Sequence, residues 1–498
     1  MRIKKYLLSI LILPVLLLCG MLSGCKKNEL DIVSKNLSTY TMDIEYHDNH
    51  TLTVKQTLDY KNQTDTSLDT LDLHLYPRSF RDGSLSSVVS KLNYSKCYYN
   101  GASFGDIDVS LIKLNDQEKE VKLTGDNEDL LEVKLDDNLS PNSSANLYIE
   151  YTVTLPNINH RFGYGEDTIN VANFYPIMCM YEDGEYVIDS YHYNGDPFYS
   201  EVANYSITIT APKEYILAST GDVSNLNKEE NNNIYHIEAK AVRDFAFILS
   251  DKYNVLSDNI DVVTVNYYYY KNQYPNEGLK ASVNSVSTFN KLFGEYPYNT
   301  LNVCEANFVH GGMEYPNLVF ISDAVTNQSD YINTIVHEVA HQWWYGLVGN
   351  NEYQYGWLDE GLTEYSTLLF YEENPEYNVD TKALIKNTTN SYVTFVEVYE
   401  KVFGSVDSTM NRKLNEYKNE SEYVYIAYVK GMLIFDSLRE VIGKDKLLKG
   451  LQTYFEDNKF KIATPDDLIN AIEKSTGTNL NDFFKSWIDG KVRILQVS

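Results

Sequence analysis

The sequence predicts a multidomain α+β protein, with an N-terminal antiparallel β domain over residues 39–253 followed by a mainly helical domain over residues 254–498. Three observations predict this fold class. The chain has 498 residues, more than one domain of about 150 residues needs. Apolar and polar residues alternate in its first half, as they do on strands with one buried face. In its second half, apolar residues recur at helical spacing.

The first 24 residues predict a lipoprotein signal peptide. A basic start precedes the apolar run Tyr6–Leu18, which is shorter than the roughly 20 residues that a membrane span needs. Leu22-Ser23-Gly24-Cys25 follows and resembles the bacterial lipobox. The resemblance implies cleavage before Cys25 and lipidation of its thiol, which would anchor the protein to the bacterial cell membrane on its extracytoplasmic side. The alternative is a secreted protein with an incidental cysteine.

Residues 25–38 are mostly polar and are expected to form a tether between this anchor and the first domain. Beyond the anchor, only Cys97, Cys179 and Cys304 remain. Their wide spacing indicates neither a disulfide framework nor a CxxC metal site, and one pair among the three is left open. The net charge of −28 repels phosphate backbones and argues against nucleic acid as a partner.

Alternating runs separated by polar turns predict the strands of the β domain. The apolar residues that share a face are Tyr40, Met42, Ile44 and Tyr46 in the first run, Leu147, Ile149, Tyr151, Val153 and Leu155 in the second, and Tyr205, Ile207 and Ile209 in the third. Such runs continue to about residue 253, which sets the boundary of the domain.

The chain beyond this boundary begins with a short mixed region, roughly 254–325, and continues with helical patterns. These patterns cover residues 330–347, 360–374, 426–443 and 464–475. The last has a clear start, because Thr464 can cap the helix, Pro465 suits the first helical position and Asp467 lies in the first turn.

The first of these helices carries His-Glu-x-x-His. His337 and His341 are four residues apart, which places both imidazoles on one helix face, close enough to share one zinc ion. Glu338 is the next residue round the helix and is placed to bond a metal-bound water. The alternative is a polar face of an ordinary amphipathic helix. The surrounding Val336, Val339, Ala340, Trp343 and Trp344 argue against it, because histidines among apolar residues need a partner.

A third ligand is expected from the second helix. Catalytic zinc sites keep three protein ligands and an open position. Eighteen residues separate His341 from Glu360, and a loop through Gly346 and Gly349 allows a second helix, starting near 357–359, to pack Glu360 against both histidines. Glu364, one turn later, either bonds a ligand histidine or is an ordinary exposed carboxylate; both alternatives stay open.

These motifs resemble the aminopeptidase N family of gluzincin metallopeptidases, peptidase family M1. The match comprises HExxH, the 18-residue spacing and Glu360, the flanking segments "HQWWYGLVG" and "WLDEGLTEY", "GGMEY" from Gly311 to Tyr315, and "YVKG" from Tyr428 to Gly431. The resemblance implies a thermolysin-like zinc metallopeptidase domain with one Zn²⁺ per chain, acting on peptides with a free N-terminus.

The resemblance also implies roles. Glu338 is the general base and Tyr428 stabilises the oxyanion, while Gly311, Gly312, Met313 and Glu314 bind substrate. The physical reasons are that a preorganised donor stabilises developing charge and that a carboxylate can pair with the α-ammonium group of a peptide. The two glycines would let the backbone lie close along the substrate. The alternatives are an ordinary turn with a solvated Glu314 and a core tyrosine at position 428.

The chain departs from the family pattern at two places. Tyr315 stands where the family has Asn, which leaves the local geometry of that loop open. The chain ends soon after "FFKSWIDGKV", so it resembles a short bacterial lipoprotein form without the C-terminal helical domain of larger members. The sequence therefore predicts a zinc aminopeptidase. A zinc endopeptidase or other hydrolase on the same scaffold, and a binding lipoprotein without catalysis, are the competing hypotheses.

Overall fold

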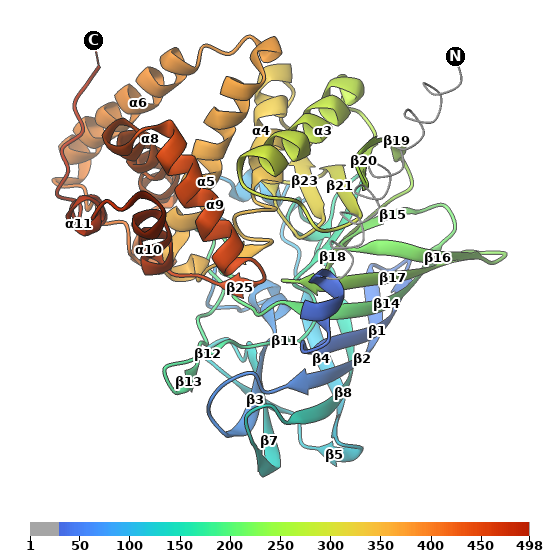
Figure 1. Cartoon of the computed structure of the whole chain (residues 1–498). Helices are drawn as coiled ribbons and strands as arrows, with labels where there is room; N and C mark the ends of the chain where they lie inside the picture. Colours follow the sequence, from blue (N-terminus) through green and yellow to red (C-terminus); the bar gives the residue numbers. More distant parts are fainter. Residues whose placement is uncertain (1–28, 498) are drawn as a thin grey trace, which may run out of the picture.

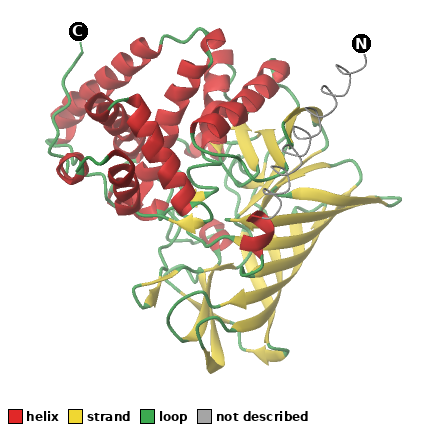
Figure 2. Ribbon diagram, in the orientation of Figure 1, coloured by secondary structure: helices red, strands yellow, loops and turns green. Residues whose placement is uncertain are grey.

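The structure is a computed structural model, which describes residues 29–497. The predicted signal peptide and lipidated Cys25 lie outside the described residues. Strands and helices occupy different parts of the molecule (Figures 1 and 2): the first half of the chain forms the sheets, and the helices after residue 325 gather above and beside them. This arrangement confirms the predicted order of a β-rich domain followed by a mainly helical one.

The largest sheet of the described chain has eight strands and forms the body of the first domain (Figure 1). In spatial order its strands are β16 (Asp222–Lys228), β17 (Asn232–Val242), β14 (Ala203–Pro212), β1 (Thr39–His47), β2 (Thr51–Lys61), β8 (Ser144–Thr154), β4 (Asp106–Leu114) and β5 (Gln117–Lys119). The predicted apolar faces of β1, β8 and β14 are buried. One expectation is wrong in detail: β1 and β14 pair in parallel, because strands so far apart in sequence are not joined by a hairpin.

Two smaller sheets and a hairpin complete the first domain. One sheet has the order β15 (Ile216–Ser219), β18 (Ala246–Ser250), β10 (Ile169–Ala172) and β9 (Phe162–Tyr164). The other has the order β11 (Ile177–Met178), β3 (Leu68–His74), β7 (Leu130–Leu139) and β6 (Lys122–Thr124), and the hairpin joins β12 (Tyr181–Glu182) to β13 (Glu185–Tyr186). Short helical segments, η1 (Tyr76–Phe80) and α2 (Tyr94–Cys97), lie in the connections.

The described part of the predicted tether is attached to the protein. Residues 29–34 are helical, and Asp31 forms an ion pair of 2.8 Å with Lys240 of β17. Glu29 lies 2.8 Å from Lys459, which follows helix α9 (Lys444–Asn458). These two ion pairs link the segment to both the β domain and the helical domain.

A mixed region opens the second half, as the sequence indicates. Its sheet has the order β19 (Asn254–Ile260), β20 (Val263–Tyr269), β21 (Thr300–Ala306), β23 (Leu318–Ser322) and β22 (Gly312–Met313), with α3 (Pro275–Leu292) between β20 and β21 in sequence. β22 is an edge strand and pairs antiparallel with β23. The edge strand consists of Gly312 and Met313 from the Gly-Gly-Met-Glu segment.

The remaining helices are α4 (Gln328–Ala340), α5 (Glu352–Glu373), α6 (Thr381–Phe403), α7 (Glu420–Tyr423), a π-helix, η4 (Val424–Val429), α8 (Lys430–Ile442), α9, α10 (Pro465–Thr476) and α11 (Asn481–Ile488). Single turns at η2 (Pro375–Tyr377) and η3 (Leu414–Glu416) and the short parallel pair β24 (Val348–Gly349) and β25 (Lys461–Ile462) connect them. Thr464 caps α10 as predicted, and its hydroxyl accepts a hydrogen bond from the Asp467 amide.

Two predicted helices have different bounds in the structure. The helix expected over residues 330–347 ends at Ala340, and His341 is its C-cap. The tight turn that follows places Tyr345 at a φ of 129°, so the helix cannot continue. The next helix begins at Glu352, but Tyr355 has non-helical angles, and its regular part therefore starts close to the expected residue 357.

One buried guanidinium joins the two domains. Arg243, which follows β17, donates hydrogen bonds to the carbonyls of Ser200 at 2.9 Å, Tyr345 at 2.9 Å and Lys461 at 3.0 Å. Gly349 lies against it, because a Cβ there would come within 2.2 Å of the guanidinium carbon. The loop between the two motif helices is thus fixed to the β domain.

The three described cysteines are free thiols in buried positions, so the disulfide that the sequence left open is not formed among them. Among residues 29–497, no helix is long and apolar enough to cross a membrane.

Candidate metal centre

The two histidines of the His-Glu-x-x-His segment point to the same place. His337 lies in the last turn of α4 and His341 caps it, and their Nε2 atoms are 3.2 Å apart. Both residues are buried. Two imidazole nitrogens this close cannot both carry a proton, so one must present a lone pair or both must share a cation.

Glu360 completes a triangle with them. Its Oε2 atom lies 3.3 Å from Nε2 of His337 and 3.3 Å from Nε2 of His341, and it makes no hydrogen bond. A regular tetrahedron with edges of this length has its centre about 2.0 Å from each corner, which is the usual distance from zinc to nitrogen or oxygen. The three residues therefore fit a zinc ion, with the fourth corner open to the cavity.

Both ligand histidines are oriented through their other ring nitrogen. Nδ1 of His341 lies 3.0 Å from the Trp344 carbonyl, to which it can donate a hydrogen bond. Nδ1 of His337 lies 3.3 Å from a carboxylate oxygen of Glu364. Such partners leave Nε2 free to bind a metal and hold the ring plane. The structure favours the first alternative for Glu364, since its carboxylate contacts a histidine of the triangle.

Glu338 lies beside the triangle and faces β22. Burial raises the pKa of its carboxyl to about 7, although the two histidines oppose the shift. Gly312 is required at this contact, because a Cβ on it would come within 2.3 Å of Glu338 Oε1. Gly311 meets only Thr334, at 3.9 Å. The resemblance implies one purpose for both glycines, but the structure shows that Gly312 makes room for Glu338.

Glu314 follows β22 and brings a second carboxylate to the site. Its side chain is buried, its Oε1 makes no hydrogen bond, and ligand atoms of Glu314, Glu338 and His341 lie within 4.8 Å of one another. Burial and the nearby Asp196 raise the pKa of Glu314 well above its usual range. An unpaired buried carboxylate of this kind favours a cationic partner.

Gln342 fixes the loop that carries Glu314. Its Nε2 donates to the carbonyls of Glu314 at 3.3 Å and Tyr315 at 3.1 Å, and its Oε1 accepts from the Asn317 amide at 2.8 Å. Tyr315 is fully buried and donates a hydrogen bond to Asn173 at 3.3 Å. The family asparagine is thus replaced by a core tyrosine that ties the loop to the β domain.

Tyr428 reaches the site from the π-helix. Its ring stacks on that of His337, with the centroids 5.9 Å apart and the planes 4° from parallel. The backbone that supports it passes very close to α5, since a Cβ on Gly431 would lie 2.7 Å from the Gly361 Cα. Lys430 is fully buried and donates to the carbonyls of Ser408 at 2.6 Å and Trp487 at 2.8 Å. The Lys-Gly pair after Tyr428 therefore has a structural purpose.

Sequence reasoning missed one acidic residue that lines the cavity. Asp196, in the loop before β14, lines the same cavity and forms an ion pair with the buried Arg161. Carboxylate atoms of Asp196, Glu314 and Glu352 lie within 4.8 Å of one another. Asp196 belongs to no recognised motif and is remote in sequence from the helices, so only the folded chain reveals it.

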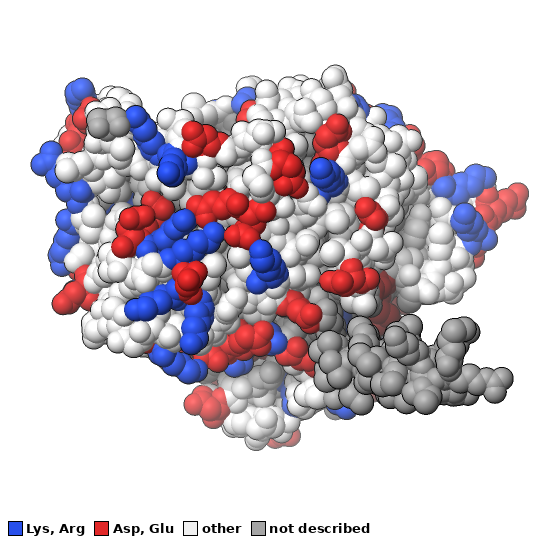
Figure 3. Space-filling view, turned by 45° about the horizontal axis from the view of Figure 1, so that its top comes forward, with Lys and Arg blue, Asp and Glu red and all other residues white. Residues whose placement is uncertain are grey.

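The cavity over the triangle has a volume of about 230 Å³, somewhat below the range of about 300–1,000 Å³ that is typical of sites for drug-sized ligands. It is lined by His310, Gly311, Gly312, Asn333 and Thr334 in addition to the charged residues already described. On the face drawn in Figure 3, basic and acidic side chains are interleaved over the surface.

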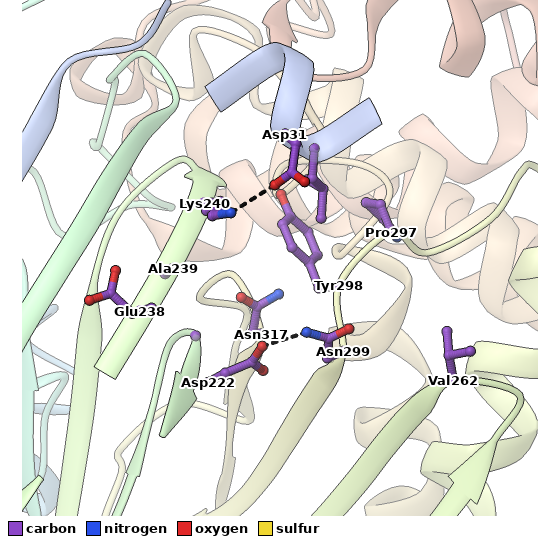
Figure 4. A pocket seen from close by; sticks show the side chains of 12 residues that line it. Asp31, Asp222, Glu238, Ala239, Lys240, Val262, Pro297, Tyr298, Asn299 and Asn317 are labelled. Carbon is purple, nitrogen blue, oxygen red and sulfur yellow. Dashed lines mark hydrogen bonds and ion pairs between the residues drawn. The ribbon is translucent and has the colours of Figure 1, made fainter. Parts of the chain in front are cut away.

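A larger pocket lies elsewhere, at the seam between the domains. Figure 4 shows that Lys240 pairs with Asp31 there and that Asn299 donates a hydrogen bond to Asp222, at 2.7 Å. Three carboxylates line this pocket, but in the described part of the chain none of the groups of three side chains whose ligand atoms lie within 4.8 Å of one another lies there. Its size alone does not make it the reactive site.

Comparison with known protein families finds a match for the part of the chain that carries the triangle. Residues 278–487 match the family model of the peptidase family M1 domain. The chain carries a peptidase family M1 domain. All three corners of the triangle, Glu338, Glu314 and Tyr428 fall inside it.

Curated relatives of the M1 domain are distant in sequence. Aminopeptidase 2 of Candida albicans is 24% identical over 384 residues, 71% of this chain and 39% of its own length. Aminopeptidase N of Lactobacillus delbrueckii subsp. lactis is 25% identical over 222 residues, 40% of this chain and 25% of its own length. The chain thus spans well under half the length of these relatives.

A solved structure of similar size has the same fold. The M1 zinc metallopeptidase of Deinococcus radiodurans has a TM-score of 0.65 and 15% identity, covering 93% of this chain and 95% of its own. The likeness extends over both domains, which confirms that the β domain and the M1 domain form one two-domain architecture.

Proposed function

We propose that this protein is a zinc-dependent aminopeptidase that removes the N-terminal residue of peptides. The observation that carries the proposal is Glu314, a buried carboxylate without a hydrogen bond on Oε1, which lies beside the metal triangle. A peptide α-ammonium group would pair with it and so place the first peptide bond over His337, His341 and Glu360. The D. radiodurans relative, as a variant bound to a Tyr-Ser-Ala substrate, supports a peptide substrate.

Proton transfer is assigned to Glu338. A zinc ion held by the triangle would polarise the scissile carbonyl and make water more acidic. Glu338 accepts the proton of the attacking water and passes it to the departing amine. These two transfers need a carboxyl group within reach of both the water and the amine. Its buried position beside the open corner of the triangle suits a group that must both take and return a proton.

Tyr428 is assigned to the oxyanion that forms on the carbonyl oxygen. Its hydroxyl is neutral, because burial raises its pKa well above the usual value, and it therefore remains a hydrogen-bond donor throughout the reaction. The ring is already stacked on His337 and needs no reorganisation. A preorganised donor of this kind stabilises charge where it develops.

A panel of aminoacyl fluorogenic substrates, with free and with acylated amines, tests the proposal. We expect hydrolysis of the free-amine substrates alone, and loss of activity on zinc removal with recovery on its return. Glu314→Gln should lower kcat/KM by about 10- to 100-fold, the value of one charge-assisted bond. Glu277→Gln, on the exposed face of α3, is the matched control and should leave it unchanged. Cleavage of acylated substrates only would assign an endopeptidase instead.

The lipid anchor at Cys25 is also a proposal, and it rests on the lipobox-like Leu22-Ser23-Gly24-Cys25 after an apolar run. The ion pairs of Glu29 and Asp31 support it to the extent that they fix the protein end of such an anchor. We expect the wild-type chain to incorporate labelled fatty acid and to sediment with membranes in a bacterial host. A Cys25→Ser variant that labels and sediments equally well would overturn the assignment.

A further inference from the structure

A second, smaller pocket opens from the catalytic cavity. We call it the side pocket; it shares Asp196, His310, Gly312 and Tyr428 with the cavity over the metal triangle. It lies on the side of β22, whereas Asn333 and Thr334 of α4 line the catalytic cavity but not the side pocket. A side chain of a substrate bound near Glu314 and Tyr428 would therefore lie next to the side pocket.

This position is that of the first side chain of a peptide. If the α-ammonium group pairs with Glu314 and the carbonyl lies between Glu338 and Tyr428, the Cα between them carries its side chain toward the pocket that shares Tyr428 and Gly312. The rest of the peptide then leaves past α4. This step rests on the proposed aminopeptidase function.

Aromatic and apolar side chains form part of the walls of the side pocket, beside its charged residues. Tyr193, Phe308, Tyr423, Met313 and Val424 line it. Such walls accept a long aliphatic stem, and tyrosine and phenylalanine faces also attract a cationic head group.

The charges of the side pocket are unevenly matched. Arg161 is neutralised by its ion pair with Asp196, and its guanidinium lies 5.0 Å from the centre of the Phe198 ring. Glu420, the first residue of α7, has no such partner: within residues 29–497, no lysine or arginine nitrogen lies within 4.0 Å of its carboxylate. The basic group nearest to it in the described chain is Nδ1 of His310, at 3.8 Å.

His310 does not supply the missing positive charge. Burial lowers the pKa of its imidazole, and the neighbouring Arg161 lowers it further, against the opposing pull of Glu420. The imidazole is therefore neutral near pH 7. The Glu420 carboxylate therefore has no cationic partner in the side pocket of the described chain.

The β domain holds the Glu420 carboxylate in place. Nδ2 of Asn93, which precedes α2, donates to both carboxylate oxygens, at 3.1 and 3.2 Å. A fork of this kind fixes the direction of the carboxylate while adding no charge. Asn93 acts through Glu420 and is a positioning residue.

We propose that the side pocket binds the side chain of the N-terminal residue of the substrate, and that Glu420 makes it select lysine and arginine. The aromatic walls contact the aliphatic stem, and the guanidinium or ammonium group pairs with the carboxylate that Asn93 orients. Leucine and methionine fill the walls but leave Glu420 unpaired, and an N-terminal glutamate would meet like charge.

Matched substrates test the charge alone. The arginyl and citrullinyl amides of one fluorophore differ little in size, as do the lysyl and norleucyl amides, but only arginine and lysine are cationic. We expect the wild-type, zinc-loaded protein to favour the cationic member of each pair by about tenfold or more in kcat/KM, as one charge-assisted bond predicts. Equal rates within each pair would overturn the inference without any variant.

Variants then assign the effect to Glu420. In Glu420→Gln we expect the arginine-to-citrulline ratio to fall to about one, with citrulline and norleucine rates within about threefold of wild type. Asn93→Ala should lower the ratio partway, because the carboxylate loses its orientation. Glu397→Gln, on the exposed face of α6, is the matched control and should keep the full ratio. A full ratio in Glu420→Gln contradicts the assignment.

The two proposals fail in different ways. If the protein cleaves norleucyl and leucyl amides but does not separate arginine from citrulline, only the side-pocket inference is wrong. If it cleaves no free-amine substrate at all, the aminopeptidase function is wrong, and the inference falls with it.

Discussion

The contact between Gly361 and Gly431 makes the strongest prediction about how the site is assembled. A methyl group on Gly431 would lie 2.7 Å from the Gly361 Cα, whereas an ordinary contact begins at 3.4 Å. The obstacle is backbone, which cannot rotate away. In Gly431→Ala, α5 and the start of α8 must therefore separate by about 0.7 Å, at a cost of about 1–3 kcal/mol for overpacking.

This separation moves one catalytic group away from the others. The metal triangle belongs to α4 and α5, while Tyr428 moves with α8. We expect Gly431→Ala to bind zinc with unchanged stoichiometry but to lose about 10- to 100-fold in kcat, because a displacement near 1 Å can cost about two orders of magnitude. The thermal midpoint should fall by about 2–12 °C, at about 2–4 °C for each kcal/mol.

The assay combines kcat on a free-amine aminoacyl substrate with zinc analysis and thermal unfolding. Gly450→Ala is the matched control, since its Cβ would meet Ile472 at 2.9 Å, where α9 packs on α10 and no catalytic group is attached. It should lose stability and keep kcat. Wild-type kcat in Gly431→Ala, or an equal loss of kcat in Gly450→Ala, would refute the reasoning.

Three further predictions follow from single contacts. Glu364→Gln should weaken zinc binding by about 10- to 100-fold in a chelator competition, because His337 loses its charged partner; an unchanged affinity would contradict this. Tyr428→Phe should lower kcat by about 100- to 1,000-fold with zinc retained, and a loss confined to KM would refute its assigned role. Burial lowers the pKa of His74 to about 4, so the unfolded chain takes up a proton near pH 6.5 that the folded chain takes up only near pH 4. The free energy of unfolding should therefore fall between pH 6.5 and 4, by about 3 kcal/mol from this group. Chemical denaturation of wild type and His74→Gln at several pH values measures this, and the free energy of unfolding of the variant should depend less steeply on pH. Identical slopes for the two proteins would exclude the effect.

The sequence predicts well whatever depends on local spacing. The alternation of Tyr40, Met42, Ile44 and Tyr46 follows from strand geometry alone, and all four are buried. The cap at Thr464 is equally local, since its hydroxyl and the Asp467 amide are three residues apart. The residues of the metal triangle can be predicted from the sequence for the same reason, because one helix and one defined loop set their spacing.

Features that depend on packing between distant segments escape the sequence. The parallel pairing of β1 with β14 joins segments about 165 residues apart, and no local pattern indicates the partner. Asp196 enters the site through its ion pair with Arg161. Helix α4 ends at Ala340 although apolar residues continue, because Trp343 and Trp344 fill the core from a turn instead of from a helix.

The buried ammonium group of Lys430 has a consequence for how this scaffold can be re-engineered. One of its two carbonyl partners belongs to Trp487 at the end of α11, 57 residues further along the chain. A segment running from Gly311 to Gly431 contains every motif residue, but grafted into another scaffold it would keep only the Ser408 carbonyl as a partner for the buried Lys430 side chain. Loop exchange or consensus redesign within this domain must therefore treat α11 as part of the catalytic unit.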